Sequence, residues 1–196
     1  MPKEVSVELT EHPGKTIAQD FPNVTVLFTD IVGFTKISGY MTADEVVNML
    51  NKMVSLFYER ARREGIEKIK TIGDAYMAAA GLTKDYDNGG AVKMIDFARG
   101  LLDDINSFNK DSAVKIQIRL GINTGNLVAG VIGKTKFIYD IWGDTVNVAS
   151  RMESTGEPMK IHVSEETYEQ TKEKFAYGNS IDIEVKGKGL MKTYFL

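Results

Sequence analysis

The chain has 196 residues, of which 43% are apolar and 26% are charged, enough for one sizeable globular domain. The absence of cysteine excludes disulfides, zinc–thiolate sites and cysteine nucleophiles. The net charge of −3 argues against a nucleic-acid surface, and no apolar run has the length of a transmembrane helix or the form of a signal peptide. The sequence therefore predicts a cytoplasmic protein that does not bind nucleic acid.

The chain opens with a polar segment that carries two prolines. We expect residues 1–20 to form a lead-in or linker and residues 21–196 to form the domain. A β-branched apolar run over residues 23–29 predicts the first strand, which ends at Asp30.

A long amphipathic helix follows. Thr42 and Glu45 form a capping box at its start, and apolar residues at helical spacing continue to about residue 63. Two apolar runs, 66–72 and 75–81, flank a Gly-Asp turn and predict a β-hairpin.

The rest of the chain alternates between apolar residues at helical spacing and apolar runs typical of strands. A polar loop over 85–90 precedes a second amphipathic helix over about 94–105. The remaining expected elements are strands over 114–123 and 127–132, a helix over 143–152, a strand over 160–163, a short helix capped by Ser164, and a strand over 194–196.

The order strand, helix, hairpin, helix, strand is the split βαβ pattern of a ferredoxin-like sheet. The expected fold is α/β, an α+β sandwich. A ferredoxin-like βαββαβ core has a mixed, mainly antiparallel sheet with helices packed on it, and a C-terminal αβ extension follows. In this topology the first strand lies beside the hairpin, so Asp30 and Asp74 become neighbours although they are 44 positions apart.

Two carboxylates at strand ends suit hard divalent cations. Mg²⁺ takes one or two carboxylates plus substrate phosphates, and two such ions can clamp both oxygens of an in-line phosphoryl transfer. The backbone carbonyl of Ile31 is a further candidate ligand beside Asp30 and Asp74. Taken singly, each aspartate is also explained as an ordinary turn residue.

Two residue pairs have the chemistry of nucleotide recognition. Asn147 and Arg151 are four apart on an expected helix, so they share one face, and an amide with a guanidinium suits a ribose and a phosphate. Lys70 is a donor and Asp140 an acceptor, a pair that matches adenine, whereas guanine presents the opposite pattern. Spacing alone leaves a solvated helix face and a surface ion pair as alternatives.

Two basic residues complete the candidate set. Arg119 lies in an apolar strand, where an arginine is unusual unless it is paired. Lys186 opens a Lys-Gly-Lys-Gly run, which is either a flexible phosphate-binding loop or a solvated turn.

Three segments, residues 28–35, 68–77 and 140–152, resemble the catalytic domain of class III nucleotidyl cyclases of the adenylyl type, like the homodimeric bacterial ones. The resemblance covers about residues 20–196. By this resemblance, Asp30, Asp74 and the Ile31 carbonyl bind two divalent cations, Mg²⁺ or Mn²⁺. Lys70 and Asp140 select the purine, Asn147 orients the ribose, and Arg151 stabilises the transition state. The terminal phosphates are bound by Arg119 and Lys186, and further substrate contacts are expected at Phe34 and Thr35.

The resemblance also implies a reaction and an assembly. The expected reaction converts ATP to 3′,5′-cyclic AMP and pyrophosphate, because guanylyl relatives carry a glutamate and usually a cysteine where Lys70 and Asp140 stand. The expected assembly is a head-to-tail homodimer with composite sites, within a longer protein that has an N-terminal sensor or membrane region. A guanylate cyclase, a non-catalytic nucleotide-binding module and a palm-type polymerase remain as alternatives.

Overall fold

The computed structural model describes residues 17–82, 90–133 and 136–196, together with residues 5, 7, 10 and 11. Its elements follow in chain order: β1 (Ile17–Ile31), α2 (Phe34–Ser38), α3 (Ala43–Glu64), β2 (Glu67–Ile72), β3 (Ala75–Ala80), α4 (Gly90–Asp111), β4 (Ile118–Ile132), β5 (Ile138–Trp142), α5 (Asp144–Ser154), β6 (Ile161–Ser164), α6 (Glu165–Thr171), β7 (Ile181–Val185) and β8 (Gly189–Phe195).

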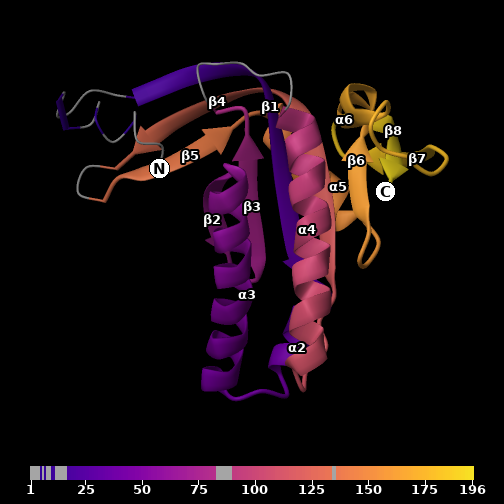
Figure 1. Cartoon of the computed structure of the whole chain (residues 1–196). Helices are drawn as coiled ribbons and strands as arrows, with labels where there is room; N and C mark the ends of the chain where they lie inside the picture. Colours follow the sequence, from indigo (N-terminus) through magenta and orange to yellow (C-terminus); the bar gives the residue numbers. More distant parts are fainter. Residues whose placement is uncertain (1–4, 6, 8–9, 12–16, 83–89, 134–135) are drawn as a thin grey trace.

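One mixed sheet organises the chain, with the strand order β2-β3-β1-β4-β6-β8-β7 and β5 paired to β4. The long helices α3 and α4 lie side by side across one face of this sheet (Figure 1). A second apolar cluster, which includes Ala149 of α5, covers the opposite face of the strands. The sheet therefore carries α3 and α4 on one face and α5, packed mainly on β4 and β1, on the other.

The ferredoxin-like prediction is confirmed. The segment β2-β3-β1-β4 is antiparallel at each pairing, and β1 and β2 are therefore parallel with β3 between them, as in a split βαβ unit. The C-terminal αβ extension joins through β6, which pairs with β4 in parallel, and continues through β8 and β7.

Local signals fix the ends of α3. The Thr42 hydroxyl accepts the amide of Glu45, and the Glu45 carboxylate accepts the amide of Thr42 at 2.8 Å, so the predicted capping box is present. Gly65 ends the helix with φ 63°, a left-handed conformation that favours glycine.

Several sequence expectations were wrong in detail. The first strand begins at Ile17 and not at residue 23, so residues 17–20 of the expected lead-in lie within the sheet, and the side chain of Ile17 is buried. The two strands expected over 114–123 and 127–132 are one strand, β4, because its long partner β1 pairs with both halves. The short elements α2, β5 and β7 were not expected.

Other expected elements agree with the structure within a few residues at their ends. The hairpin, the helices α4, α5 and α6, and the strand β6 are present, and the last strand extends back to Gly189. Most of the expected loop over 85–90 lies outside the described residues. None of the described helices is both long enough and apolar enough to cross a membrane.

Candidate active site

The sheet brings Asp30 and Asp74 together. Asp30 is the second-last residue of β1, and Asp74 lies in the turn between β2 and β3. Because Thr29 of β1 pairs with Tyr76 of β3, the two aspartates meet at the same end of adjacent strands. Gly73, with φ 62°, permits the tight turn that presents Asp74.

The two carboxylates interact directly. Burial and the adjacent Asp30 carboxylate raise the pKa of Asp74 to about 6, and hydrogen bonds from the backbone of Asp74 and Ile31 oppose the rise only in part. Burial and the neighbouring carboxylate thus both disfavour the charged form of Asp74.

Two adjacent carboxylates suit divalent cations. Two carboxylates are enough for Mg²⁺, which keeps several water ligands and takes further oxygens from substrate phosphates. Among the described residues no group of three or more histidine, cysteine, aspartate or glutamate side chains gathers as a metal cage, so any cation here depends on such outside ligands. Whether the Ile31 carbonyl takes part remains a prediction.

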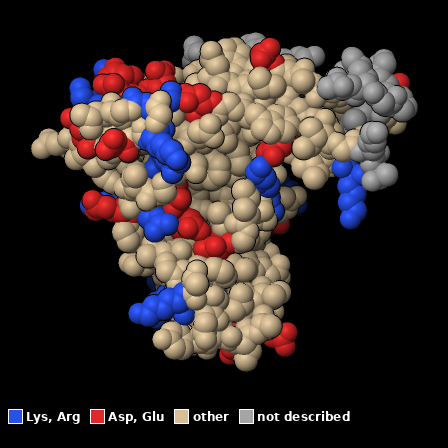
Figure 2. Space-filling model, turned by 180° about the vertical axis from the view of Figure 1, so that it is seen from behind, with Lys and Arg blue, Asp and Glu red and all other residues tan. Residues whose placement is uncertain are grey.

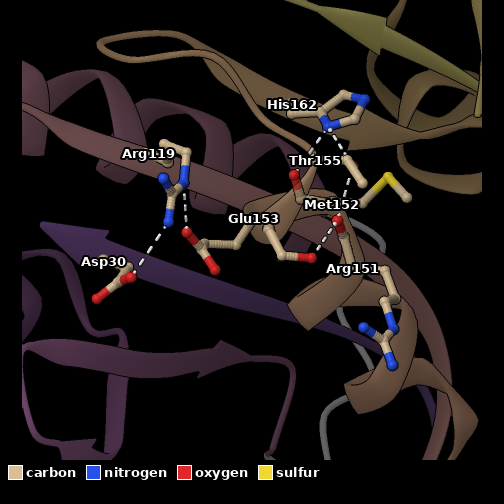
Figure 3. A network of polar contacts seen from close by, with 8 residues as sticks. Asp30, Arg119, Arg151, Met152, Glu153, Thr155 and His162 are labelled. Atoms are coloured by element: carbon tan, nitrogen blue, oxygen red, sulfur yellow. Dashed lines mark hydrogen bonds and ion pairs between the residues drawn. The ribbon is translucent and has the colours of Figure 1, made fainter. Parts of the chain in front are cut away.

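Arg119 lies beside Asp30. It is the cross-strand partner of Asp30, and its Nη2 donates to Asp30 Oδ2 at 3.2 Å (Figure 3). Its Nε donates to Oε1 of Glu153 on α5 at 2.8 Å. The arginine predicted to be paired within an apolar strand is thus paired with two carboxylates, and it is about one quarter exposed.

Lys70 and Asp140 also lie together, although they are 70 positions apart. Lys70 Nζ donates to Asp140 Oδ2 at 2.5 Å, and the backbone amide of Ile141 donates to Asp140 Oδ1 at 2.9 Å. Lys70 stands on β2, and Asp140 stands on β5, where it is buried. The expected donor and acceptor therefore form one unit in a single chain.

Asn147, Arg151 and Lys186 face a separate hollow. They line a cavity of about 660 Å³ between α5 and the β7–β8 turn, with Lys188 and Asp144 at its edge, where these two form an ion pair. Both Asn147 and Arg151 are exposed on one side of α5. The described residues that line this cavity include neither Asp30 nor Asp74.

Within one chain the two groups of residues point apart. Glu153 extends from α5 toward Arg119 and Asp30, whereas Arg151, two positions earlier on the same helix, extends away from them (Figure 3). Within one copy of the chain, Asn147 and Arg151 therefore lie apart from Asp30 and Arg119.

Phe34 and Thr35 are the first two residues of α2, directly after the end of β1. Phe34 is partly buried against the core under α3 and α4, and Thr35 is exposed. Their expected contact with substrate remains a prediction.

Sequence reasoning missed Glu153 and Lys188. Nothing in the spacing links Glu153 to Arg119, 34 positions earlier, because the contact depends on how α5 packs on β4. Lys188 was visible in the Lys-Gly-Lys-Gly run, but its partner Asp144 was not.

The face opposite α3 and α4 carries charges of both signs. Lysine and arginine side chains alternate with aspartate and glutamate side chains around a broad uncharged area (Figure 2). No extended field of one sign covers this view of the described residues.

Comparison with known proteins identifies the family. Residues 16–196 match the family described as the adenylate and guanylate cyclase catalytic domain. The chain belongs to this family of class III nucleotidyl cyclase domains.

Both kinds of cyclase occur among similar proteins. The germination-specific adenylate cyclase of Dictyostelium discoideum is 44% identical over the whole chain, which spans 23% of that protein. Guanylate cyclase D of Mus musculus is 43% identical over 93% of the chain, which spans 17% of that protein. The chain therefore corresponds to less than a quarter of the length of these two cyclases.

A solved structure has the same fold. The catalytic core of a rhodopsin-guanylyl cyclase with converted specificity, in complex with ATPαS, superposes with a TM-score of 0.85 and 40% identity over 91% of this chain and 96% of that chain. The cyclase fold is thus shared along nearly the whole chain.

Proposed function

We propose that this domain is an adenylate cyclase, which converts ATP to 3′,5′-cyclic AMP and pyrophosphate. The Lys70–Asp140 pair carries the choice of ATP. Because cyclases of both specificities are similarly related to the chain, overall identity does not choose between the two substrates.

The pair offers adenine what it needs. The Lys70 ammonium donates to a ring nitrogen, and the Asp140 carboxylate accepts from the exocyclic amine. Guanine in the same position would set its ring N–H group against the lysine and its carbonyl against the carboxylate. Polar groups that are mispaired in a binding site strongly lower kcat/KM for the mismatched substrate.

We further propose that the working unit is a head-to-tail homodimer. The metal-side residues Asp30, Asp74 and Arg119 of one copy face the Asn147, Arg151 and Lys186 set of the other. Two observations support this arrangement. Arg151 points away from Asp30 within one chain (Figure 3), and the β4–β5 arm exposes apolar side chains that a second copy can cover, namely Val128, Ile132, Phe137, Ile138 and Trp142.

The side chains divide the reaction between them. Two divalent cations, Mg²⁺ or Mn²⁺, held by Asp30 and Asp74 would activate the ribose 3′-hydroxyl and neutralise the phosphates. Asn147 orients the ribose, and Arg151 donates to the oxygens of the α-phosphate as charge develops in the transition state. Arg119 and Lys186 hold the terminal phosphates, which leave as pyrophosphate.

The test compares ATP and GTP as substrates. Formation of both cyclic nucleotides is measured with Mg²⁺ and with Mn²⁺ across protein concentrations. Adenylate cyclase activity with specific activity that rises with concentration, until dimers saturate, supports the proposal. The Asp30→Ala variant should lose turnover while it retains its fold, because this carboxylate lies at the partly exposed end of β1.

Two alternatives are separated by the same assay. Preferential use of GTP would assign a guanylate cyclase, and binding of nucleotide without turnover of either triphosphate would assign a regulatory binding module. The four residues Asp30, Asp74, Asn147 and Arg151 favour a cyclase over a binding module, since binding alone does not require an arginine placed for a transition state.

A further inference from the structure

Glu153 is a partly buried carboxylate next to the metal-side residues. Its side chain is 12% exposed and lies in the last turn of α5. Burial raises the pKa of Glu153, and the neighbouring Arg119 guanidinium opposes this rise.

Arg119 is divided between two carboxylates. Its Nε donates to Glu153 Oε1 at 2.8 Å, and its Nη2 donates to Asp30 Oδ2 at 3.2 Å (Figure 3). Nε and Nη2 form one edge of the guanidinium, which commonly binds a single carboxylate through both groups. Because Glu153 takes Nε, Arg119 contacts Asp30 through Nη2 alone.

The backbone at Glu153 is fixed on two sides. A Cβ atom on Gly121 of β4 would lie 1.9 Å from the amide nitrogen of Glu153, so only glycine lets α5 approach the strand this closely. On the other side, Nδ1 of the buried His162 donates to the carbonyl of Met152 at 2.8 Å. The Glu153 carboxylate therefore reaches Arg119 from a backbone segment that is closely packed on both sides.

We propose that Glu153 is a positioning residue that holds Arg119 toward the terminal phosphates and prevents it from pairing with Asp30 through both nitrogens. Without Glu153, Arg119 is free to close on Asp30 with Nε and Nη2, which neutralises a carboxylate needed for cations and turns the guanidinium away from substrate. This inference rests on the proposed function, because it assigns the phosphates to Arg119.

The first experiment measures nucleotide binding directly. Binding of α,β-methylene ATP in the presence of Mn²⁺ is followed by calorimetry for the wild type, Glu153→Ala and Glu153→Gln, together with kcat and KM for ATP. Loss of a charged hydrogen-bond partner should weaken analogue binding about tenfold in Glu153→Ala and raise KM by a similar factor, with kcat changed by less than about threefold. Glu153→Gln retains an acceptor oxygen and should recover most of the affinity.

A double variant separates positioning from a general structural role. In an Arg119→Ala background, Glu153→Ala should produce no further loss of analogue binding, because its effect passes through Arg119. Glu157→Gln is the matched control; it changes an exposed carboxylate paired with Lys160 just beyond α5 and should leave binding unchanged.

The outcomes are distinct. Wild-type binding by both Glu153 variants, or an equal loss with and without Arg119, would overturn the positioning role. If Glu153→Ala melts well below the wild type, Glu153→Leu, which keeps most of the side-chain volume but has no acceptor oxygen, takes its place in both binding comparisons. A wild-type protein that binds the analogue but cyclises neither ATP nor GTP would refute the proposed function, while the binding comparison still tests Glu153.

Discussion

Lys70 on β2 and Asp140 on β5 are joined by an ion pair of 2.5 Å between Nζ and Oδ2, and Asp140 is buried at this contact. Removing the partner of a buried carboxylate destabilises the folded chain, and placing a second carboxylate against it destabilises the chain further. The two positions should therefore be changed together.

The first prediction concerns substrate choice. Lys70→Glu with Asp140→Cys exchanges the donor–acceptor order of the pair and should lower the ratio of kcat/KM for ATP over GTP by about 100-fold or more. The single Lys70→Glu variant places two carboxylates against each other and should be less active with either nucleotide than the double variant. Initial rates with each triphosphate measure both effects, and an unchanged ratio in the double variant would show that these residues do not read the purine.

A second prediction follows from the contact between Asp74 and Asp30. The pKa of Asp74 is raised to about 6 in the folded chain and is ordinary in the unfolded chain. Between about pH 4 and pH 6 the unfolded chain releases this proton while the folded chain keeps it, so the free energy of unfolding falls as the pH rises and the loss is complete above pH 6.

Asp74→Asn removes this dependence. In chelator at pH 7.5 the variant should be more stable than the wild type by about 1 kcal/mol, a value reduced for the partial exposure of the group, and the difference should vanish near pH 4. Thermal melts across this range measure it. Mn²⁺ at neutral pH should stabilise the wild type and not the variant, and parallel pH profiles for the two proteins would show that neither burial nor the Asp30 carboxylate raises the pKa of Asp74.

The proximity of Asp30 and Asp74 in the candidate site could be predicted from the sequence, because it depends only on the topology of the sheet. The split βαβ pattern predicted that Asp30 and the Asp74 turn would be neighbours, and the pairing of Thr29 with Tyr76 brings them together. The capping box at Thr42 was likewise readable, since both partners lie within four residues.

Other parts depend on packing that no spacing encodes. The expected division of β4 into two strands failed because Gly125, between the two expected runs, interrupts the apolar alternation, although the strand continues through it. Gly125 and the glycines at 121 and 130 serve close approaches of other chain segments. The contact between Arg119 and Glu153 forms because α5 packs closely on Gly121. The sequence spacing does not predict this packing.

The third prediction tests the close packing of α5 on Gly121 of β4. In Gly121→Ala the new methyl group would overlap the backbone of Glu153, which cannot move without displacing α5. The free energy of unfolding should fall by about 2–3 kcal/mol, and cyclase activity should fall with it because α5 carries Asn147 and Arg151. Denaturant titration and initial rates provide the two measurements.

Gly178→Ala is the matched control for this change. A Cβ there would meet its nearest neighbour, the Phe195 carbonyl oxygen, at an ordinary 3.7 Å. This variant should match the wild type in stability and rate, and equal losses in both variants would indicate a general intolerance of alanine and not a close packing of α5 on β4.

The fourth prediction tests whether the site is shared between two copies. In a head-to-tail dimer, Asp30→Asn damages the metal side of each site and Arg151→Ala damages the other side, so each variant alone should be inactive. When the two are mixed in equal amounts, half of the dimers formed are mixed, and each mixed dimer has one site with neither change. Activity should therefore return to about a quarter of the wild-type value per chain.

The concentration dependence and the controls complete this test. The recovered activity should rise with total protein as dimers form, and mixing either variant with itself should restore nothing. A double variant that carries Asp30→Asn and Arg151→Ala in one chain should not restore activity when it is mixed with Asp30→Asn, since neither protein has an intact Asp30. If mixing restores no activity although a tag on one variant co-purifies the other, each chain must complete its own site, and the separation of Arg151 from Asp30 within one chain would then have to close by a movement of α5.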